Sequence, residues 1–131
     1  MKKIVIIDDS LAITRLLKNV LTQEGYAVVT SNDPKEGQSM VDDEHPNLVV
    51  LDICMPGVDG WEVCRRIRQR HEMPILVLTV LEQPHDIERT FKAGADAYMT
   101  KPFSITGFLE RVQELMGPRI RRLNASKDQG T

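Results

Sequence analysis

The chain has 131 residues, with 41% hydrophobic residues, 27% charged residues and a formal net charge of −2 at pH 7. This length suits one domain with a single sizeable core, and the composition is that of an ordinary soluble globular protein. Because the charge is close to neutral, the chain as a whole is not drawn to nucleic acid or to an acidic membrane surface.

The chain carries two cysteines, Cys54 and Cys64, without a cysteine and histidine cluster at zinc-ligand spacing. We expect both to be reduced thiols. The apolar run of residues 4–7 ends in Asp8–Asp9, so it is too short and wrongly flanked for a signal peptide. No stretch approaches the roughly 20 apolar residues that span a bilayer. The sequence therefore predicts a cytoplasmic protein without membrane contact.

Five short apolar runs recur along the chain and are expected to be strands. Most of them are rich in leucine or β-branched residues and do not alternate with polar residues, which is typical of strands buried on both faces of a parallel sheet. The runs are residues 4–7, 27–29, 48–51, 75–78 and 97–99.

Helical patterns fill the gaps between the runs. The first extends from about Ile13 to a stop at Gly25, and Asp33 and Ser104 are expected to cap the second and fifth helices. The third covers residues 60–70. The fourth, residues 84–93, is expected to be the least amphipathic, with Ile87 and Phe91 as its main apolar pair.

Five repeats of strand and helix predict an α/β fold built from right-handed βαβ units. The expected architecture is a flavodoxin-like, doubly wound sheet of five parallel strands in the order 2-1-3-4-5, flanked by five helices. The domain should cover residues 1–117. Residues 118–131, basic and then polar, are expected to be a C-terminal tail or a linker toward an output domain.

Polar residues mark the ends of four of the expected strands. Asp8 and Asp9 follow the first strand, Asp52 follows the third, Thr79 follows the fourth, and Lys101 comes soon after the fifth. Ligands of such a sheet bind beyond the carboxyl ends of its strands, near the point where the strand order reverses. Because these strands are neighbours in the predicted order, we expect the five groups to converge on one pocket.

This set of side chains favours phosphoryl chemistry. Three carboxylates in one pocket repel and raise one another's pKa, and a bound Mg²⁺, which prefers oxygen ligands, removes that conflict. A metal and a lysine can offset the charge on a phosphoryl group in transfer, and a hydroxyl can donate a hydrogen bond to it. The sequence therefore predicts a magnesium-assisted phosphoryl site.

Five segments in this order resemble the receiver domain of bacterial two-component response regulators. The resemblance covers about residues 3 to 116, and although each segment alone is a weak signal, their combination on the right strand ends is specific. The segments are Asp8–Asp9, Leu51–Gly60, Thr79, Gly94–Tyr98 and Lys101–Phe103.

The resemblance implies a role for each matching residue. Asp52 would be the phosphoacceptor, taking a phosphoryl group from the phosphohistidine of a histidine kinase or phosphotransfer protein. Asp9, Asp52 and the backbone carbonyl of Cys54 would bind Mg²⁺, with Asp8 acting through water. Lys101 would pair with a phosphoryl oxygen and form a cis peptide with the following proline.

The resemblance also implies a switch. Thr79 would move toward the phosphoryl group and Tyr98 would turn inward, changing the surface of the fourth helix, fifth strand and fifth helix. That surface would control an output domain or partner, and it is a candidate homodimer interface in the phosphorylated chain. The chain itself would bind no nucleic acid. It would catalyse its own phosphorylation and autodephosphorylation without being a conventional enzyme.

Each assignment has a simpler alternative. Asp8–Asp9 can be acidic residues at a helix start, Thr79 a strand-end hydroxyl bonded to backbone, Lys101 a solvated lysine and Tyr98 a core residue. The arginines of residues 65–70 are expected to form a solvated helix face.

Three other functions remain open. A flavodoxin-like cofactor binder would need an uncharged phosphate loop after the first strand, where Asp8–Asp9 stands. An aspartyl phosphohydrolase would need an acidic group where Cys54 stands, and an unphosphorylated interaction module would have a broken acidic pocket. One departure from the family is Val80, where a small residue is usual; its branched side chain is expected to slow access to Asp52.

Overall fold

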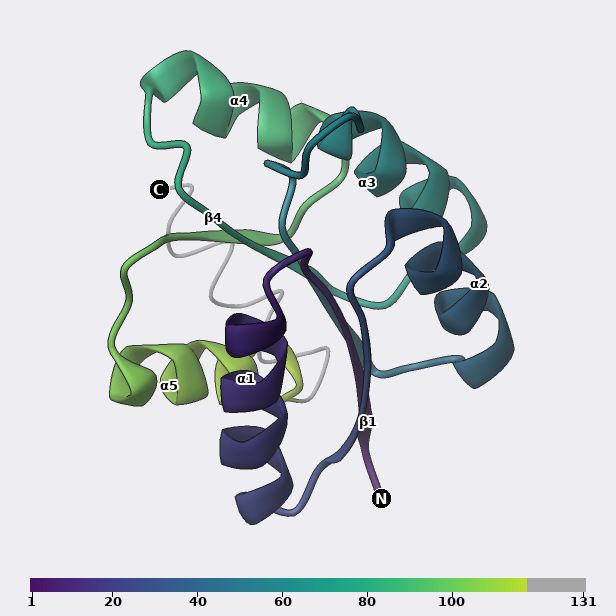
Figure 1. Ribbon diagram of the computed structural model, residues 1–131, viewed down its shortest axis with the longest axis vertical. Coiled ribbons are helices and arrows are strands. Elements are labelled where there is room, and N and C mark those ends of the chain that lie inside the picture. The colour runs from purple at the N-terminus through teal and green to yellow at the C-terminus, as the bar shows by residue number, and fades with distance from the viewer. Residues whose placement is uncertain (118–131) are drawn as a thin grey trace.

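The computed structural model describes residues 1–117, in which five strands alternate with five helices (Figure 1). The expected tail at 118–131 lies outside the described residues. The elements are β1 (Lys3–Ile7), α1 (Leu11–Gln23), β2 (Ala27–Ser31), α2 (Pro34–Glu44), β3 (Leu48–Leu51), α3 (Gly60–Arg70), β4 (Ile75–Thr79), α4 (Pro84–Lys92), β5 (Ala97–Thr100) and α5 (Ile105–Leu115).

All strand pairs are parallel, and the strand order is β2-β1-β3-β4-β5. The predicted fold class is therefore confirmed. The strands β2, β4 and β5 run one or two residues past the apolar runs that predicted them, because backbone pairing continues through Thr30, Ser31, Thr79 and Thr100. Within the described residues, none of the helices has the length and apolar composition needed to cross a membrane.

Helices cover both faces of the sheet, with α1 and α5 on one side and α2, α3 and α4 on the other (Figure 1). Successive side chains of a strand point to opposite faces, so Ile4 and Ile6 pack with α1 and α5 while Val5 and Ile7 pack toward α2 and α3. Two apolar layers thus enclose the strands. This arrangement explains why the strand sequences are apolar throughout instead of alternating.

Capping residues set the helix boundaries largely as expected. The side chains of Asp33 and Ser104 accept backbone hydrogen bonds at the starts of α2 and α5, as predicted, and Ser10, which was not predicted as a cap, does so at the start of α1. Gly25 follows α1 with φ 95°. The end of α2 was not predicted, since His45 takes the left-handed conformation with φ 47° at a position where glycine or asparagine is usual.

The sequence-based expectation for α4 was wrong. Its polar and apolar residues are more sharply segregated than in the other described helices. The side chain that it buries completely is Thr90, whereas Phe91 of the expected apolar pair is 45% exposed. The interior residue of α4 is therefore Thr90 and not Phe91, which the sequence pattern had predicted to be buried.

Candidate functional site

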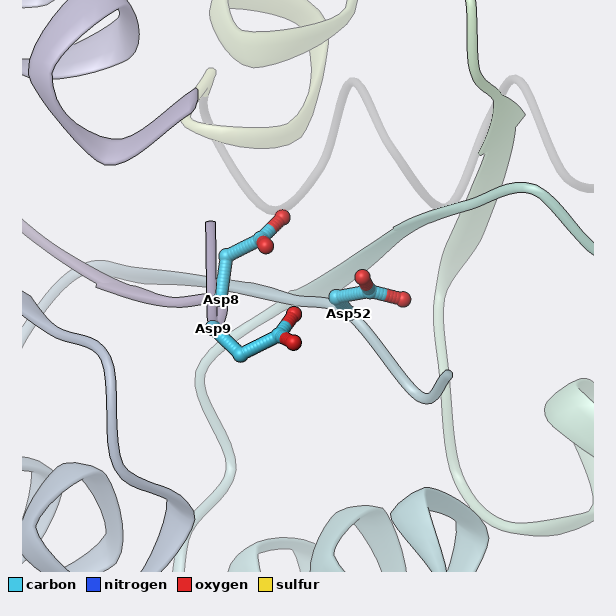
Figure 2. A group of neighbouring side chains, drawn as sticks. All are labelled: Asp8, Asp9 and Asp52. Atoms are coloured by element: carbon cyan, nitrogen blue, oxygen red, sulfur yellow. The ribbon is translucent and has the colours of Figure 1, made fainter. Parts of the chain in front are cut away.

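The three candidate carboxylates meet at the carboxyl ends of β1 and β3, which lie side by side in the sheet (Figure 2). Ile7 pairs with Leu51, and the Asp52 N–H donates to the Ile7 carbonyl at 3.0 Å, so the residues after each strand are fixed in register. Asp8, Asp9 and Asp52 each place one carboxylate oxygen within 4.8 Å of the other two. The expected convergence of the acidic residues is therefore seen.

Lys101 reaches the acidic cluster from the loop between β5 and α5. Its Nζ donates to Asp8 Oδ2 at 2.7 Å and to Asp52 Oδ2 at 3.0 Å. The Lys101 backbone N–H donates to the Thr79 carbonyl at 2.8 Å, and the Lys101–Pro102 peptide is cis, as the resemblance implied. The lysine thus bridges the residues that follow β1 and β3.

The carboxylates differ in their surroundings. Asp8 is 2% exposed, and its two oxygens accept hydrogen bonds from Lys101 Nζ and from the Ser10 N–H at 2.9 Å. Asp52 is 5% exposed and accepts from the Cys54 N–H at 2.8 Å. Asp9, in contrast, is exposed. A cation arriving from solvent therefore meets Asp9 first, with two buried and oriented carboxylates behind it.

Burial and pairing shift the pKa values of Asp8 and Lys101. Burial raises the pKa of Asp8, against the hydrogen bonds from Lys101 and Ser10 that lower it. Burial alone would lower the pKa of Lys101, but its bonds to Asp8 and Asp52 outweigh that effect and raise the pKa. Lys101 therefore stays a cation at neutral pH and offsets part of the negative charge.

The segment after Asp52 is held tightly against the start of α3. A Cβ atom on Gly60 would fall 2.2 Å from both Cα and the carbonyl oxygen of Ile53, so only glycine fits there without a backbone shift. Asp59 caps α3 by accepting from the N–H groups of Trp61 and Glu62. The position of α3 is thus fixed directly to the residue that follows Asp52.

Thr79 and Tyr98 lie on the same face of the sheet. Thr79 ends β4 and is fully buried, and the Leu81 N–H donates to its Oγ1 at 3.5 Å. Tyr98 pairs with Val77, two residues before Thr79, so the two side chains point to the same side. Burial raises the pKa of Tyr98, and its hydroxyl has no hydrogen-bond partner among residues 1–117.

An apolar groove of about 460 Å³ opens beside Lys101. Val80, the departure noted in the sequence, is 57% exposed and forms part of its wall. The other lining residues come from α1, the β5–α5 loop and the start of α5: Ile13, Leu16, Lys101, Pro102, Phe103 and Ile105. The groove therefore adjoins the acidic cluster through Lys101, which lines the groove and bonds to Asp8 and Asp52.

The expectation that the arginines of α3 are all solvated was wrong for Arg68. Its guanidinium donates to the carbonyls of His71, Met73 and Gly94 at 2.9–3.1 Å and to Asp96 Oδ2 at 2.6 Å. Spacing within one helix gives no signal for this role, because every partner lies outside α3.

Comparison with known proteins agrees with this geometry. Residues 4–113 match the model of the response regulator receiver domain. A probable transcriptional regulator, ycf27 of Cyanophora paradoxa, is 42% identical over 115 residues, which are 88% of this chain and 48% of that protein. The chain thus spans about half the length of this curated relative.

Solved structures share the fold closely. A two-component response regulator from Clostridium difficile aligns with a TM-score of 0.86 and 26% identity, covering 95% of this chain and 99% of that one. A CheY-like receiver domain protein from Methanospirillum hungatei aligns with a TM-score of 0.84 and 32% identity, covering 88% and 94%. The matched family and the acidic cluster at the ends of β1 and β3 together establish that this chain belongs to the response regulator receiver domain family.

Proposed function

We propose that this receiver domain is a phosphoacceptor switch in which Asp52 takes a phosphoryl group from a phosphohistidine. The observation that carries the proposal is the contact of Lys101 with Asp8 and Asp52 beside the exposed Asp9. This contact brings the segments that follow β1, β3 and β5 into one site, in which the Lys101 ammonium group lies among three acidic groups.

The donor set fits a hard divalent cation. The three carboxylates lie within coordination reach of one another, and Mg²⁺ favours oxygen ligands and keeps part of its water shell. Asp9, Asp52 and the Cys54 carbonyl would hold Mg²⁺, with Asp8 acting through water. When bound, the ion would supply charge stabilisation to the transferring phosphoryl group.

The transfer proposed for Asp52 is a direct displacement. A carboxylate oxygen of Asp52 forms a bond to phosphorus, the bond from phosphorus to the histidine nitrogen breaks, and the imidazole keeps the electron pair. Lys101 Nζ, already bonded to Asp52, would shift its hydrogen bond to a phosphoryl oxygen. Later attack by water on phosphorus would release phosphate and restore the carboxylate, so the domain turns over its own modification alone.

The switch would act through the face of α4, β5 and α5. A phosphoryl group adds negative charge and acceptor oxygens at one point, and the buried Thr79 hydroxyl lies at the neighbouring strand end. Its movement would leave space on the side of the sheet that Tyr98 also faces. We propose that this surface is presented to an output domain, to a protein partner or to a second copy, without direct binding of nucleic acid.

The experiment is to incubate the protein with Mg²⁺ and a small phosphodonor and to measure its intact mass. The wild type should gain one labile phosphoryl group, and Asp52→Asn should gain none. A chelator should abolish the gain, because the three carboxylates need the cation. Asp43→Asn, which removes an exposed acid on α2, is the matched control and should behave as wild type.

The same experiment tests the rival functions. Steady catalytic turnover of an external phosphate ester that is lost in Asp52→Asn would support an aspartyl phosphohydrolase instead, since a receiver should turn over only its own aspartyl phosphate. A wild-type protein that gains no phosphoryl group at saturating Mg²⁺ would contradict the proposal and leave an unphosphorylated interaction module as the better account.

A further inference from the structure

We propose that Trp61 is a positioning residue that ties α4 to the Asp52 turn and thereby stabilises the receiver before phosphorylation. The inference rests on the proposed function, in which phosphorylation of Asp52 changes the surface formed by α4. It assigns to the α3–α4 contact a role in the switch that is separate from Thr79 and Tyr98.

Trp61 is fixed at the phosphoacceptor end of α3. Its backbone N–H is held by Asp59, and it follows Gly60, whose backbone lies so close to Ile53 that no side chain fits between them. Ile53 is the residue directly after Asp52. A displacement of the Asp52 turn is therefore transmitted to the base of the Trp61 side chain.

The indole of Trp61 reaches across to α4, which lies against the start of α3 (Figure 1). Its Nε1–H donates to Thr90 Oγ1 at 3.1 Å, and the Thr90 hydroxyl donates to the Asp86 carbonyl at 2.7 Å. The Arg89 guanidinium lies 4.0 Å from the centre of the indole ring, within the range of a cation–π interaction. Two consecutive residues of α4 therefore contact the indole: Thr90 accepts from its N–H, and Arg89 lies over the face of the ring.

The rest of α4 has few other side-chain anchors. Thr90 is the residue that α4 buries completely, and Gln83 at its N-cap makes no side-chain capping bond. The apolar residue next to Thr90, Phe91, is 45% exposed. The indole bond to Thr90 is thus a principal restraint on where α4 lies.

The Trp61–Thr90 bond is present together with the unphosphorylated arrangement of the site. In the structure Asp52 is a carboxylate bonded to Lys101 and to the Cys54 N–H, and the Trp61–Thr90 bond is formed at the same time. If movement of α4 after phosphorylation breaks this bond, its free energy stabilises only the carboxylate arrangement. By linkage, removing the bond then raises the affinity for every ligand that favours the phosphorylated arrangement.

The test is the affinity for beryllofluoride, a stable mimic of the phosphoryl group, measured at saturating Mg²⁺ by fluorine NMR. Trp61→Phe keeps an aromatic ring and removes the N–H donor, and Thr90→Val keeps the shape and removes the acceptor. Each should bind beryllofluoride about three- to tenfold more tightly than wild type, as expected from the loss of one hydrogen bond in one of two states.

Two controls make the result specific. Thr90→Ser keeps the hydroxyl and should bind like the wild type. The double variant Trp61→Phe/Thr90→Val should bind no more tightly than either single variant, since both changes remove the same bond. Lower stability without tighter binding in both single variants would show a purely structural role and overturn the inference.

The outcome also separates this inference from the proposed function. Wild type that binds beryllofluoride with the same affinity as Trp61→Phe and Thr90→Val overturns the role of Trp61 and leaves the phosphoacceptor proposal standing. Wild type that binds no beryllofluoride at all overturns both.

Discussion

At the scale of single residues, the contact between Lys101 and the two buried carboxylates sets the charge of the site. Three carboxylates and one ammonium group leave two negative charges in excess when all are ionised. Asp8 and Asp52 each also accept a hydrogen bond from one backbone N–H, which holds the two carboxylates in orientation in the absence of a metal ion. The site is therefore preorganised and still attractive to a divalent ion.

The buried thiol of Cys64 gives a pH-dependent prediction. Burial raises its pKa from 9.0 to about 11, so the unfolded state loses its proton first as the pH rises. The free energy of unfolding should then fall between about pH 8 and about pH 10.5, by about 2 kcal/mol from this group. Urea unfolding of wild type and Cys64→Ala at both pH values checks this.

The comparison between the two proteins isolates the thiol. Cys64→Ala also loses packing, but that loss is the same at both pH values, so only the change with pH matters. An equal loss of stability in wild type and Cys64→Ala would mean that other groups cause the alkaline destabilisation.

The residues of the site were predictable from sequence because each follows an apolar run that could only be a buried strand. The predicted strand order is enough to place the side chains that follow these strands at one edge of the sheet, namely Asp8, Asp9, Asp52 and Thr79. The exposure of each carboxylate was not predictable. Asp8 is buried and accepts hydrogen bonds from Lys101 and from the Ser10 N–H, whereas its neighbour Asp9 is exposed.

At the scale of elements, Arg68 joins α3 to the segments that precede β4 and β5. Its guanidinium donates to the carbonyls of Met73 and Gly94 and to Asp96, with donor–acceptor distances of 2.6–3.0 Å. The Asp96 carboxylate also accepts from the Ile75 N–H. One side chain thus satisfies backbone groups at the starts of two strands.

Arg68→Met should therefore lower the free energy of unfolding by roughly 2–4 kcal/mol, because it leaves three carbonyls without their donor and removes the ion pair with Asp96. Arg66→Met is the matched control. The Arg66 side chain is 62% exposed and, within residues 1–117, pairs only with Glu62, so its loss should cost less than about 0.5 kcal/mol. Similar urea midpoints for the two variants would show that the Arg68 contacts contribute no more than a surface ion pair.

Element boundaries were predictable where Asp33 and Ser104 cap the second and fifth helices, whereas the Ser10 cap, which starts α1 at Leu11 instead of the expected Ile13, was not predicted. They were not predictable where tertiary contacts decide. The burial of Thr90 in α4 goes with a partner in another element, since its hydroxyl accepts from Trp61 of α3. The left-handed His45 at the end of α2 has no signal in the local sequence, because glycine or asparagine is usual there.

At the scale of the whole molecule, the sheet order places β1 beside β3, so the buried Asp8 and Asp52 meet the exposed Asp9 at the carboxyl edge of the sheet. Lys101 offsets only part of the negative charge of the three carboxylates, so we expect a bound cation to reduce their remaining repulsion. Stability of the domain should then depend on occupancy of the proposed site.

Magnesium should raise the stability of the whole domain. At about 100 times the dissociation constant, the free energy of unfolding should increase by about 2.7 kcal/mol, because the ion binds the folded site and not the unfolded chain. Urea unfolding with and without Mg²⁺ measures the increment, which should be lost in Asp9→Asn and kept in Asp43→Asn. An increment that survives in Asp9→Asn would place the ion elsewhere.

The phosphorylated residue can be identified directly. After incubation with Mg²⁺ and a phosphodonor, borohydride reduces an aspartyl phosphate to homoserine, and peptide mass mapping locates the change. The account predicts homoserine at position 52 and at no other aspartate of the chain. Conversion at Asp8 or Asp9 instead, or an unmodified Asp52 in protein that carries phosphate, would contradict it.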